Sequence, residues 1–170
     1  MSEISKSVKS GKCSDRNISG KYAVYGSTGV IAYSDSYQYD TENILIARVG
    51  ANAGFIHIAR GKYDVTDNTL IVELNNTDCI LKFVYYYLTT VNINQYAKGG
   101  GQPLITSSII KDLLIPIPPM AEQERIVSIL DRFDRLTNDL TTGLPAEIEK
   151  RRQQYEYYRD RLLTFKQIDA

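Results

Sequence analysis

The apolar positions in the last third of the chain recur at alternating intervals of three and four residues. This spacing forms one narrow apolar stripe on a helix, and another helix usually covers such a stripe. We call this stripe the seam and expect it to be a dimer interface. Its members are Ile126, Ile129, Phe133, Leu136, Leu140, Leu144, Ile148, Tyr155, Tyr158, Leu162 and Phe165. Arg151 also occupies a seam position, where it would make a polar contact with a partner helix or anchor another subunit.

Two proline positions define where the helices of this region begin and break. Pro119 suits a first helical position, because the amide that proline lacks is unpaired there in any case. Pro145, in Gly143-Leu144-Pro145, makes a straight helix unfavourable by about 3 kcal/mol. Apolar residues nevertheless recur at every fourth position across this break, so we expect a kink or a one-turn gap rather than a reversal.

Shorter apolar runs between glycine-rich turns fill the first two thirds of the chain. They predict strands at residues 23–25, 30–33, 44–49, 55–59 and 69–74. The spacing becomes helical over 78–92, and Thr106 is placed to cap a short helix over 109–113. The fold class is therefore α+β: a mixed α/β domain over 1–119, followed by a long, kinked or broken helical coiled coil over 120–170.

Composition limits the class of protein. The chain has 170 residues, of which 43% are apolar and 24% charged, as in a soluble globular protein. It contains no apolar stretch long enough to span a membrane, and its first residues lack the apolar core of a secretory signal. Cys13 and Cys79 are too few for a disulfide framework, so we interpret them as reduced thiols in a cytoplasmic protein.

The charge balance argues against indiscriminate nucleic-acid binding. Twenty basic and twenty acidic residues give a net charge of zero, whereas such binding usually needs a strong basic excess. The first 22 residues are locally basic, with Lys6, Lys9, Lys12, Arg16 and Lys21 against two acidic residues. Specific DNA binding would require such residues to gather on one face. The alternative, which the sequence alone favours, is a solvated and frayed N-terminus.

The chain shows no catalytic constellation, and we predict that it is not an enzyme. Its single histidine, His57, lies in an alternating strand, where we interpret it as a hydrogen-bonded strand residue. No phosphate-binding loop or metal-ligand spacing is present, so we expect no cofactor and no metal. The 13 tyrosines suit either a polar interface or half-buried strands, and the sequence does not separate these two interpretations.

Several segments resemble one family. Residues 115–127, followed by Leu130-Asp131, resemble the end of a target recognition domain in specificity subunits of type I restriction–modification systems. Residues 144–163 resemble the helical spacer of the same subunits. Three weaker matches to the recognition domain lie upstream, at residues 20–31, 48–54 and 101–105.

The resemblance implies a DNA specificity subunit without catalysis of its own. Family members usually carry two recognition domains and two spacers, whereas this chain has one of each, as in a half-subunit or a fragment. Its opening strand also looks shortened. Two copies paired through the seam would read a two-part inverted-repeat DNA site. The implied partners are double-stranded DNA, methyltransferase subunits, the restriction subunit and a second copy of the chain.

Loops of the recognition domain would carry the DNA contacts that the resemblance implies. The candidates are Lys12, Lys21, Tyr25, Ser27, Thr28, Arg48, Asn52, Lys98, Gln102, Thr106 and Ser107. Glycine loops are often only turns, however, and Arg48 has Asp64 and Asp67 as alternative partners. A second hypothesis is a truncated interaction protein that pairs with a methyltransferase or a full-length specificity subunit and reads no DNA.

Overall fold

The computed structural model describes residues 1–13, 15–75, 78–98, 103–138 and 143–163. The chain divides into two compact units, Met1–Ile126 and Val127–Ala170. The strands, all in the first unit, are β1 Ser5–Ser10, β2 Tyr22–Gly26, β3 Gly29–Ser34, β4 Asn43–Ala47, β5 Ile56–Ala59, β6 Tyr63–Val65 and β7 Thr69–Leu74. The helices are α1 Leu81–Thr90, the short 3₁₀ helix η1 Ile93–Tyr96, α2 Ser107–Asp112, α3 Met120–Asn138 and α4 Leu144–Leu163.

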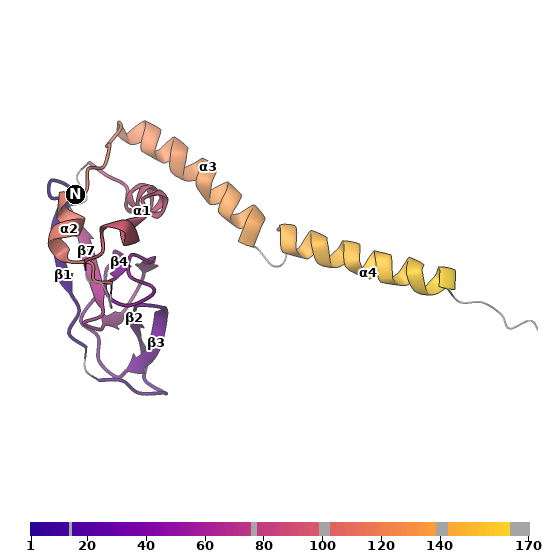
Figure 1. Cartoon of the computed structure of the whole chain (residues 1–170), viewed down its shortest axis with the longest axis horizontal. Helices are drawn as coiled ribbons and strands as arrows, with labels where there is room; N and C mark the ends of the chain where they lie inside the picture. Colours follow the sequence, from indigo (N-terminus) through magenta and orange to yellow (C-terminus); the bar gives the residue numbers. More distant parts are fainter. Residues whose placement is uncertain (14, 76–77, 99–102, 139–142, 164–170) are drawn as a thin grey trace, which may run out of the picture. The chain divides into compact units, whose positions relative to one another are not determined.

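The core of the first unit is built on a four-stranded antiparallel sheet in the order β1-β7-β4-β5. All five residues of β4 are buried, which confirms the buried strand predicted there. In the register of the sheet, Ile44 pairs with Val72 and Leu45 pairs with Ile71. Within the first unit, α1 and α2 lie at one end and the β2–β3 hairpin lies at the other (Figure 1).

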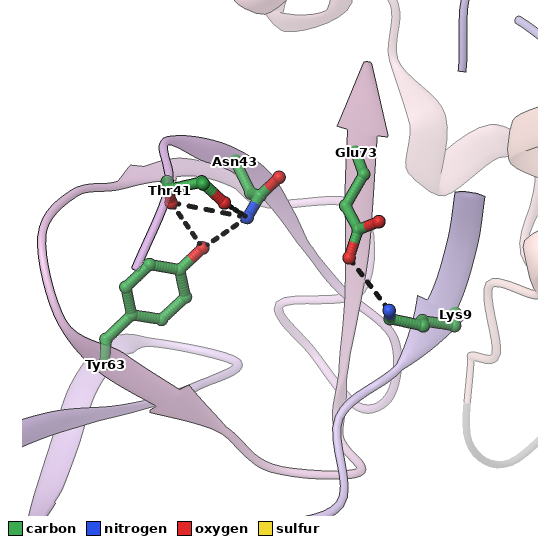
Figure 2. Close-up of polar contacts among 5 residues, drawn as sticks. All are labelled: Lys9, Thr41, Asn43, Tyr63 and Glu73. Carbon is green, nitrogen blue, oxygen red and sulfur yellow. Dashed lines mark hydrogen bonds and ion pairs between the residues drawn. The ribbon is translucent and has the colours of Figure 1, made fainter. Parts of the chain in front are cut away.

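The second sheet has the order β3-β2-β6, with β2 and β6 parallel. Its β6 strand carries Tyr63, a fully buried side chain that packs in the core with Leu45 and Ile71. The Tyr63 hydroxyl accepts a hydrogen bond from Asn43 Nδ2 at 2.7 Å and donates to the Thr41 carbonyl at 3.2 Å (Figure 2). This network joins the second sheet to the start of β4.

The N-terminus is not frayed, so that expectation is wrong. Met1 is buried, and its amino group donates to the carbonyl of Leu113 just after α2. The strand that follows Met1 is β1, which pairs with β7 along its length and has one register irregularity between Ser5 and Ser7. Lys9 extends from β1 to Glu73 on β7, with 2.8 Å between Nζ and Oε1 (Figure 2).

The predicted helices are present, with bounds that differ by a few residues. The range 78–92 contains α1, and α2 begins two residues before the predicted start at Ile109. The side chain of Thr106 accepts a hydrogen bond from the Ile109 amide at 3.4 Å, as expected for a helix cap. At α3, Pro119 lies just outside the helix, and its carbonyl accepts from the Gln123 amide at 3.1 Å. Pro119 is therefore the cap and not the first helical residue.

The second unit contains the rest of α3 and all of α4. Gly143 precedes α4, and its carbonyl accepts a hydrogen bond from the Glu147 amide at 3.2 Å. Pro145 is tolerated because it lies in the first turn, where no intrahelical donor is needed. The expected kink or one-turn gap falls on residues 139–142, which lie outside the described residues. Neither α3 and α4 nor the other described helices have the length and apolar character that a membrane crossing requires.

Candidate nucleic-acid interface

The turn between β6 and β7 is the point where two candidate DNA contacts meet. The Thr66 amide donates to the carbonyl of Tyr25 at 2.9 Å, and the Arg48 amide donates to the carbonyl of Asn68 at 2.8 Å. Arg48 Nη1 also lies 3.4 Å from the Asp67 carbonyl oxygen. Of the two partners anticipated for Arg48, Asp67 is therefore the one in contact, and it contacts Arg48 through its backbone carbonyl and not its carboxylate. These bonds hold the backbones of Tyr25 and Arg48 beside one turn, while the partly buried ring of Tyr25 packs against Tyr63 of the core, with 5.5 Å between ring centroids.

Lys12 is anchored beside the same turn. The amide of Gly11 donates to Thr69 at 3.1 Å, and the amide of Cys13 donates to Val65 at 2.9 Å. A Cβ on Gly11 would lie 2.1 Å from the Val65 carbonyl oxygen, so only glycine allows the chain to approach this closely. Lys12 itself is exposed between the two anchored residues. Its backbone is fixed while its side chain remains available to solvent.

The β4–β5 turn brings Asn52 to this side of the unit. The amide of Ile105 donates to the carbonyl of Arg48 at 2.8 Å, and the amide of Gly50 donates to Pro103 at 3.1 Å. These two bonds attach residues 103–105 to the base of the turn. Asn52 is exposed within the turn. Arg48 and Asn52 therefore belong to one braced loop structure.

The remaining candidates near this loop differ in whether their side chains are exposed or already used in local hydrogen bonds. Lys98 is exposed and exchanges two backbone hydrogen bonds of 3.0 Å with Leu104. Thr106 caps α2, and its hydroxyl also lies 2.8 Å from that of Ser108, so it is occupied by local contacts. Ser107 is partly exposed in the first turn of α2. The candidate Gln102 lies outside the described residues.

The β2–β3 hairpin presents Ser27 and Thr28 at its tip. Gly26 pairs with Gly29, and the two residues between them form the turn. Gly29 has a φ of +100°, a conformation that favours glycine. Lys21 precedes β2 at the other end of the strand, roughly 16 Å away for five residues at 3.3 Å each. The structure does not bring Lys21 together with the hairpin tip.

The described residues offer no constellation for catalysis or for metal binding. They contain no group of three His, Cys, Asp or Glu side chains that could hold a metal ion. Cys13 and Cys79 are both free and buried, and burial raises the pKa of the Cys13 thiol to about 11. A thiol in this state is a poor nucleophile at neutral pH. The described residues offer instead a set of loops with hydrogen-bonding side chains. We call these loops, which carry Lys12, Ser27, Thr28, Arg48 and Asn52, the DNA face.

Comparison with known proteins identifies the family. The model of the type I restriction modification DNA specificity domain matches residues 1–150. This chain belongs to that family. It is 47% identical over 90 residues to the EcoR124I/EcoR124II specificity subunit of Escherichia coli, covering 51% of this chain and 22% of that protein. It is 31% identical over 120 residues to the EcoprrI specificity subunit of the same species, covering 71% and 30%.

A solved structure of the type I family shares this fold. The crystal structure of the type I restriction–modification S subunit from M. genitalium superposes with a TM-score of 0.68 at 22% sequence identity. The match covers 95% of this chain and 44% of that subunit. The chain therefore spans less than half the length of these specificity subunits. The fold predicted from the sequence, a mixed α/β domain followed by helices, is confirmed at this level.

The environment of His57 corrects one expectation within this specificity domain. His57 lies on β5, as predicted, and is about half buried. Its Nε2 atom is buried and has no hydrogen-bond partner among the described residues. The expectation of a hydrogen-bonded strand histidine is therefore wrong. Burial lowers its pKa, and the ring is therefore largely neutral at physiological pH. Gly29 of the hairpin tip packs beside it, because a Cβ there would lie 3.4 Å from the imidazole.

Two exposed residues of this domain were absent from the candidates. Arg16 lines a groove against β3 with Val30 and Ile31, both of which are exposed. Phe55 follows the β4–β5 turn, and 55% of its surface is exposed. Successive strand residues point to opposite faces, so an inward Ile56 places the ring of Phe55 outward, and the sequence could have indicated this. No sequence signal indicated that Arg16 would lie beside β3.

Proposed function

We propose that this chain is the DNA-sequence specificity component of a type I restriction–modification system. One observation supports the proposal: backbone hydrogen bonds hold the segments that carry Lys12, Tyr25 and Arg48 beside the same β6–β7 turn. Asn52 lies in the braced loop that begins at Arg48. A recognition domain needs such an arrangement, since direct readout requires several side chains at fixed relative positions.

The proposed contacts follow from the chemistry of the candidate side chains. Arg48 would contact guanine through two parallel hydrogen bonds, and Asn52 and Gln102 would contact adenine edges. Lys12, Lys21 and Lys98 would contact phosphate and set the orientation of the duplex. Ser27, Thr28 and Ser107 would supply hydroxyl contacts, whereas the ring of Tyr25 packs against Tyr63 and the hydroxyl of Thr106 caps α2. With zero net charge, the chain would depend on these specific contacts more than on general attraction to phosphate.

The helical seam supports the proposed pairing with a second copy. Apart from the partly buried Ile126, its described side chains are exposed along both helices, with 59% of Phe133 and 67% of Ile148 accessible. Ile129, Leu136, Leu144, Tyr155 and Tyr158 are likewise more than 40% accessible. Apolar positions of this spacing are covered by a partner helix in coiled coils. Leu140 and the side chains of Leu162 and Phe165 lie outside the described residues.

Pairing around a twofold axis would place two identical DNA readers at a fixed separation. Such a dimer would recognise an inverted repeat with an unread gap, because twofold dimers generally bind pseudo-palindromic half-sites. Adenine methylation and ATP-driven cleavage would belong to methyltransferase and restriction subunits that dock on the assembly. The chain would need no cofactor of its own.

Methylation mapping tests this proposal. The chain would be co-expressed with the methyltransferase subunit of its own system, and methylated adenines would be mapped across the host DNA. A two-part inverted-repeat motif is the expected result. Unlike halves would show that the chain works beside a different reader or within a longer protein. No methylation from a co-purifying complex would favour the second hypothesis, an interaction protein that reads no DNA.

A further inference from the structure

Phe55 presents an exposed aromatic ring next to the β4–β5 turn that carries Asn52. It is 55% exposed, whereas its neighbour Ile56 is 8% exposed. A single exposed apolar residue is ordinary on a protein surface. What sets Phe55 apart is the rigidity of its support and its place beside Asn52 and Arg48.

The backbone of Phe55 is fixed by a tight hydrogen-bonded turn. Its amide donates to the Asn52 carbonyl at 2.9 Å, and its carbonyl accepts from the Ala47 amide at 2.8 Å. The Gly54 amide returns to the Ala47 carbonyl at 2.8 Å. Gly54 has a φ of +91°, which side-chain-bearing residues rarely adopt. Phe55 and Asn52 therefore keep a constant relative position.

Neighbouring segments brace this turn from outside. Asn94 Nδ2 donates to the Ala53 carbonyl at 2.8 Å, and the Gly50 amide donates to Pro103 at 3.1 Å. A Cβ on Gly54 would lie 2.9 Å from the Asn94 amide nitrogen, so the two segments are in close contact. A braced turn loses little conformational entropy on binding and can therefore discriminate between ligands by small contacts.

The ring itself is also oriented. His57 packs edge-on against Phe55, with 4.6 Å between ring centroids and 71° between planes. Gly29 of the hairpin tip also lies close to His57, because a Cβ there would be 3.4 Å from the imidazole. His57 therefore contacts both Phe55 and the hairpin tip.

The surroundings of Phe55 fit a hydrogen-bonding ligand better than an apolar protein surface. The groove beside it has a mixed lining: Val91 and Ile93 are apolar, and Asn52, Thr89, Asn92 and Asn94 supply amides and a hydroxyl. A protein-docking site would present a contiguous apolar patch instead. One fixed apolar ring among amides and hydroxyls matches the major-groove edge of an A·T pair, which presents a methyl group beside hydrogen-bonding atoms.

We infer that Phe55 is a specificity-determining residue that packs against the C5-methyl group of a thymine in the major groove. Asn52, on the same turn, reads an adjacent adenine through its amide. This inference rests on the proposed function and adds a base preference to it: each half-site contains an A·T pair beneath the β4–β5 turn.

Removal of the methyl group from the DNA tests the inference directly. The complex of the chain with its methyltransferase subunit would be titrated with duplexes that carry the mapped motif. In each duplex one thymine of the half-site is replaced by deoxyuridine, which lacks only the methyl group. Wild-type binding should weaken about fourfold at one position, the effect of one buried methyl-sized group. Phe55→Ala should bind both duplexes equally at that position, and Phe55→Leu should retain part of the difference.

Controls separate a lost contact from a lost fold. Leu114→Ala removes an apolar side chain that is 90% exposed and outside the candidate face, and it should keep the full deoxyuridine effect. The unfolding midpoints of all variants should match that of the wild type.

Two results would overturn the inference while leaving the proposed function intact. They are an undiminished deoxyuridine effect in Phe55→Ala and no sensitive thymine in the wild type. If Phe55→Ala changed only how strongly the DNA bends, Phe55 would act as a wedge between base pairs, and the inference would also be overturned. Failure to map any motif would instead overturn the proposed function, and the inference with it.

Discussion

Gln123 Oε1 accepts a hydrogen bond from the Ile80 amide at 2.8 Å, and this contact joins α3 to the segment that precedes α1. The Nε2 atom of the same side chain donates to the carbonyls of Asp78 at 2.9 Å and Pro118 at 2.8 Å. Gln123 is fully buried although it lies in a helix that is otherwise largely exposed. One side chain thus fixes the first turn of α3 on the first unit.

Gln123→Leu should destabilise the first unit by about 2–4 kcal/mol. Leucine fills a similar volume but leaves one amide and two carbonyls without their partners. Urea unfolding monitored by tyrosine fluorescence measures the change. Glu124→Gln, an exposed change at the next position, is the control and should stay within about 0.5 kcal/mol of the wild type. Equal stability of the two variants would show that water replaces the lost bonds.

Tyr63 should make the fold sensitive to alkaline pH. Burial raises the pKa of Tyr63 from its ordinary 10.0 to about 12. The protonated hydroxyl therefore contributes stability that is complete below pH 10 and is lost as the pH rises through about 12. The loss is about 2–3 kcal/mol, at 1.36 kcal/mol for each pKa unit.

Urea midpoints between pH 8 and pH 11.5 test this dependence. Tyr63→Phe should be less stable at pH 8 by about 1 kcal/mol, because its bonds to Asn43 and Thr41 are lost. Its stability should then fall less steeply with pH than that of the wild type. Parallel pH curves for the two proteins would assign the alkaline loss to other tyrosines.

The Lys9–Glu73 ion pair should contribute modestly across the β1–β7 ladder. The hydrogen bond from Lys9 lowers the pKa of Glu73 below its ordinary 4.5, so the stabilisation is present above pH 4.5 and is lost as the carboxyl group protonates. Half of the Lys9 side chain is exposed, which limits the coupling to about 0.5 kcal/mol. A double-mutant cycle with Lys9→Met and Glu73→Gln measures this coupling, which should vanish at pH 2.5.

Charges in the seam should dissociate the proposed dimer without unfolding the chain. Phe133→Asp and Ile148→Asp each place a carboxylate in the paired interface, whereas both positions are exposed in the single chain. Leu140→Asp and Leu162→Asp should act in the same way. Sedimentation equilibrium gives the mass, and Ser128→Asp adds the same charge to α3 outside the seam. A dimer that persists in all four variants would place the interface elsewhere.

Arg48→Ala should weaken binding to the mapped DNA site by about 1–3 kcal/mol and relax base choice at one position. Its long contact with Asp67 contributes little to the fold, so stability should change by less than about 0.5 kcal/mol. Gln102→Ala should relax a different position. Arg60→Ala is the matched control, because Arg60 is equally basic, pairs with Glu42 at 2.9 Å and follows the opposite end of β5. Fluorescence anisotropy with matched and mismatched duplexes measures both effects.

The strongest sequence predictions concern elements with a local pattern. The buried run in β4, the β2–β3 hairpin around its glycine turn and the helix capped by Thr106 are all present in the structure. In each case the signal lies within a few neighbouring residues. Two strands had no local signal, for the opposite reason. β1 is polar and basic, so an opening strand was expected only from the resemblance, and β6, with three residues, was missed.

The sequence by itself determined the family, the α+β class and the seam, because each depends on residue spacing along the chain. Only the tertiary structure decided that the segments carrying Lys12, Tyr25 and Arg48 lie beside one turn, and that Gln123 is buried while its helical neighbours are exposed. These relationships join segments tens of residues apart through backbone hydrogen bonds. Such pairings depend on the closure of the whole sheet and leave no periodic pattern in the sequence.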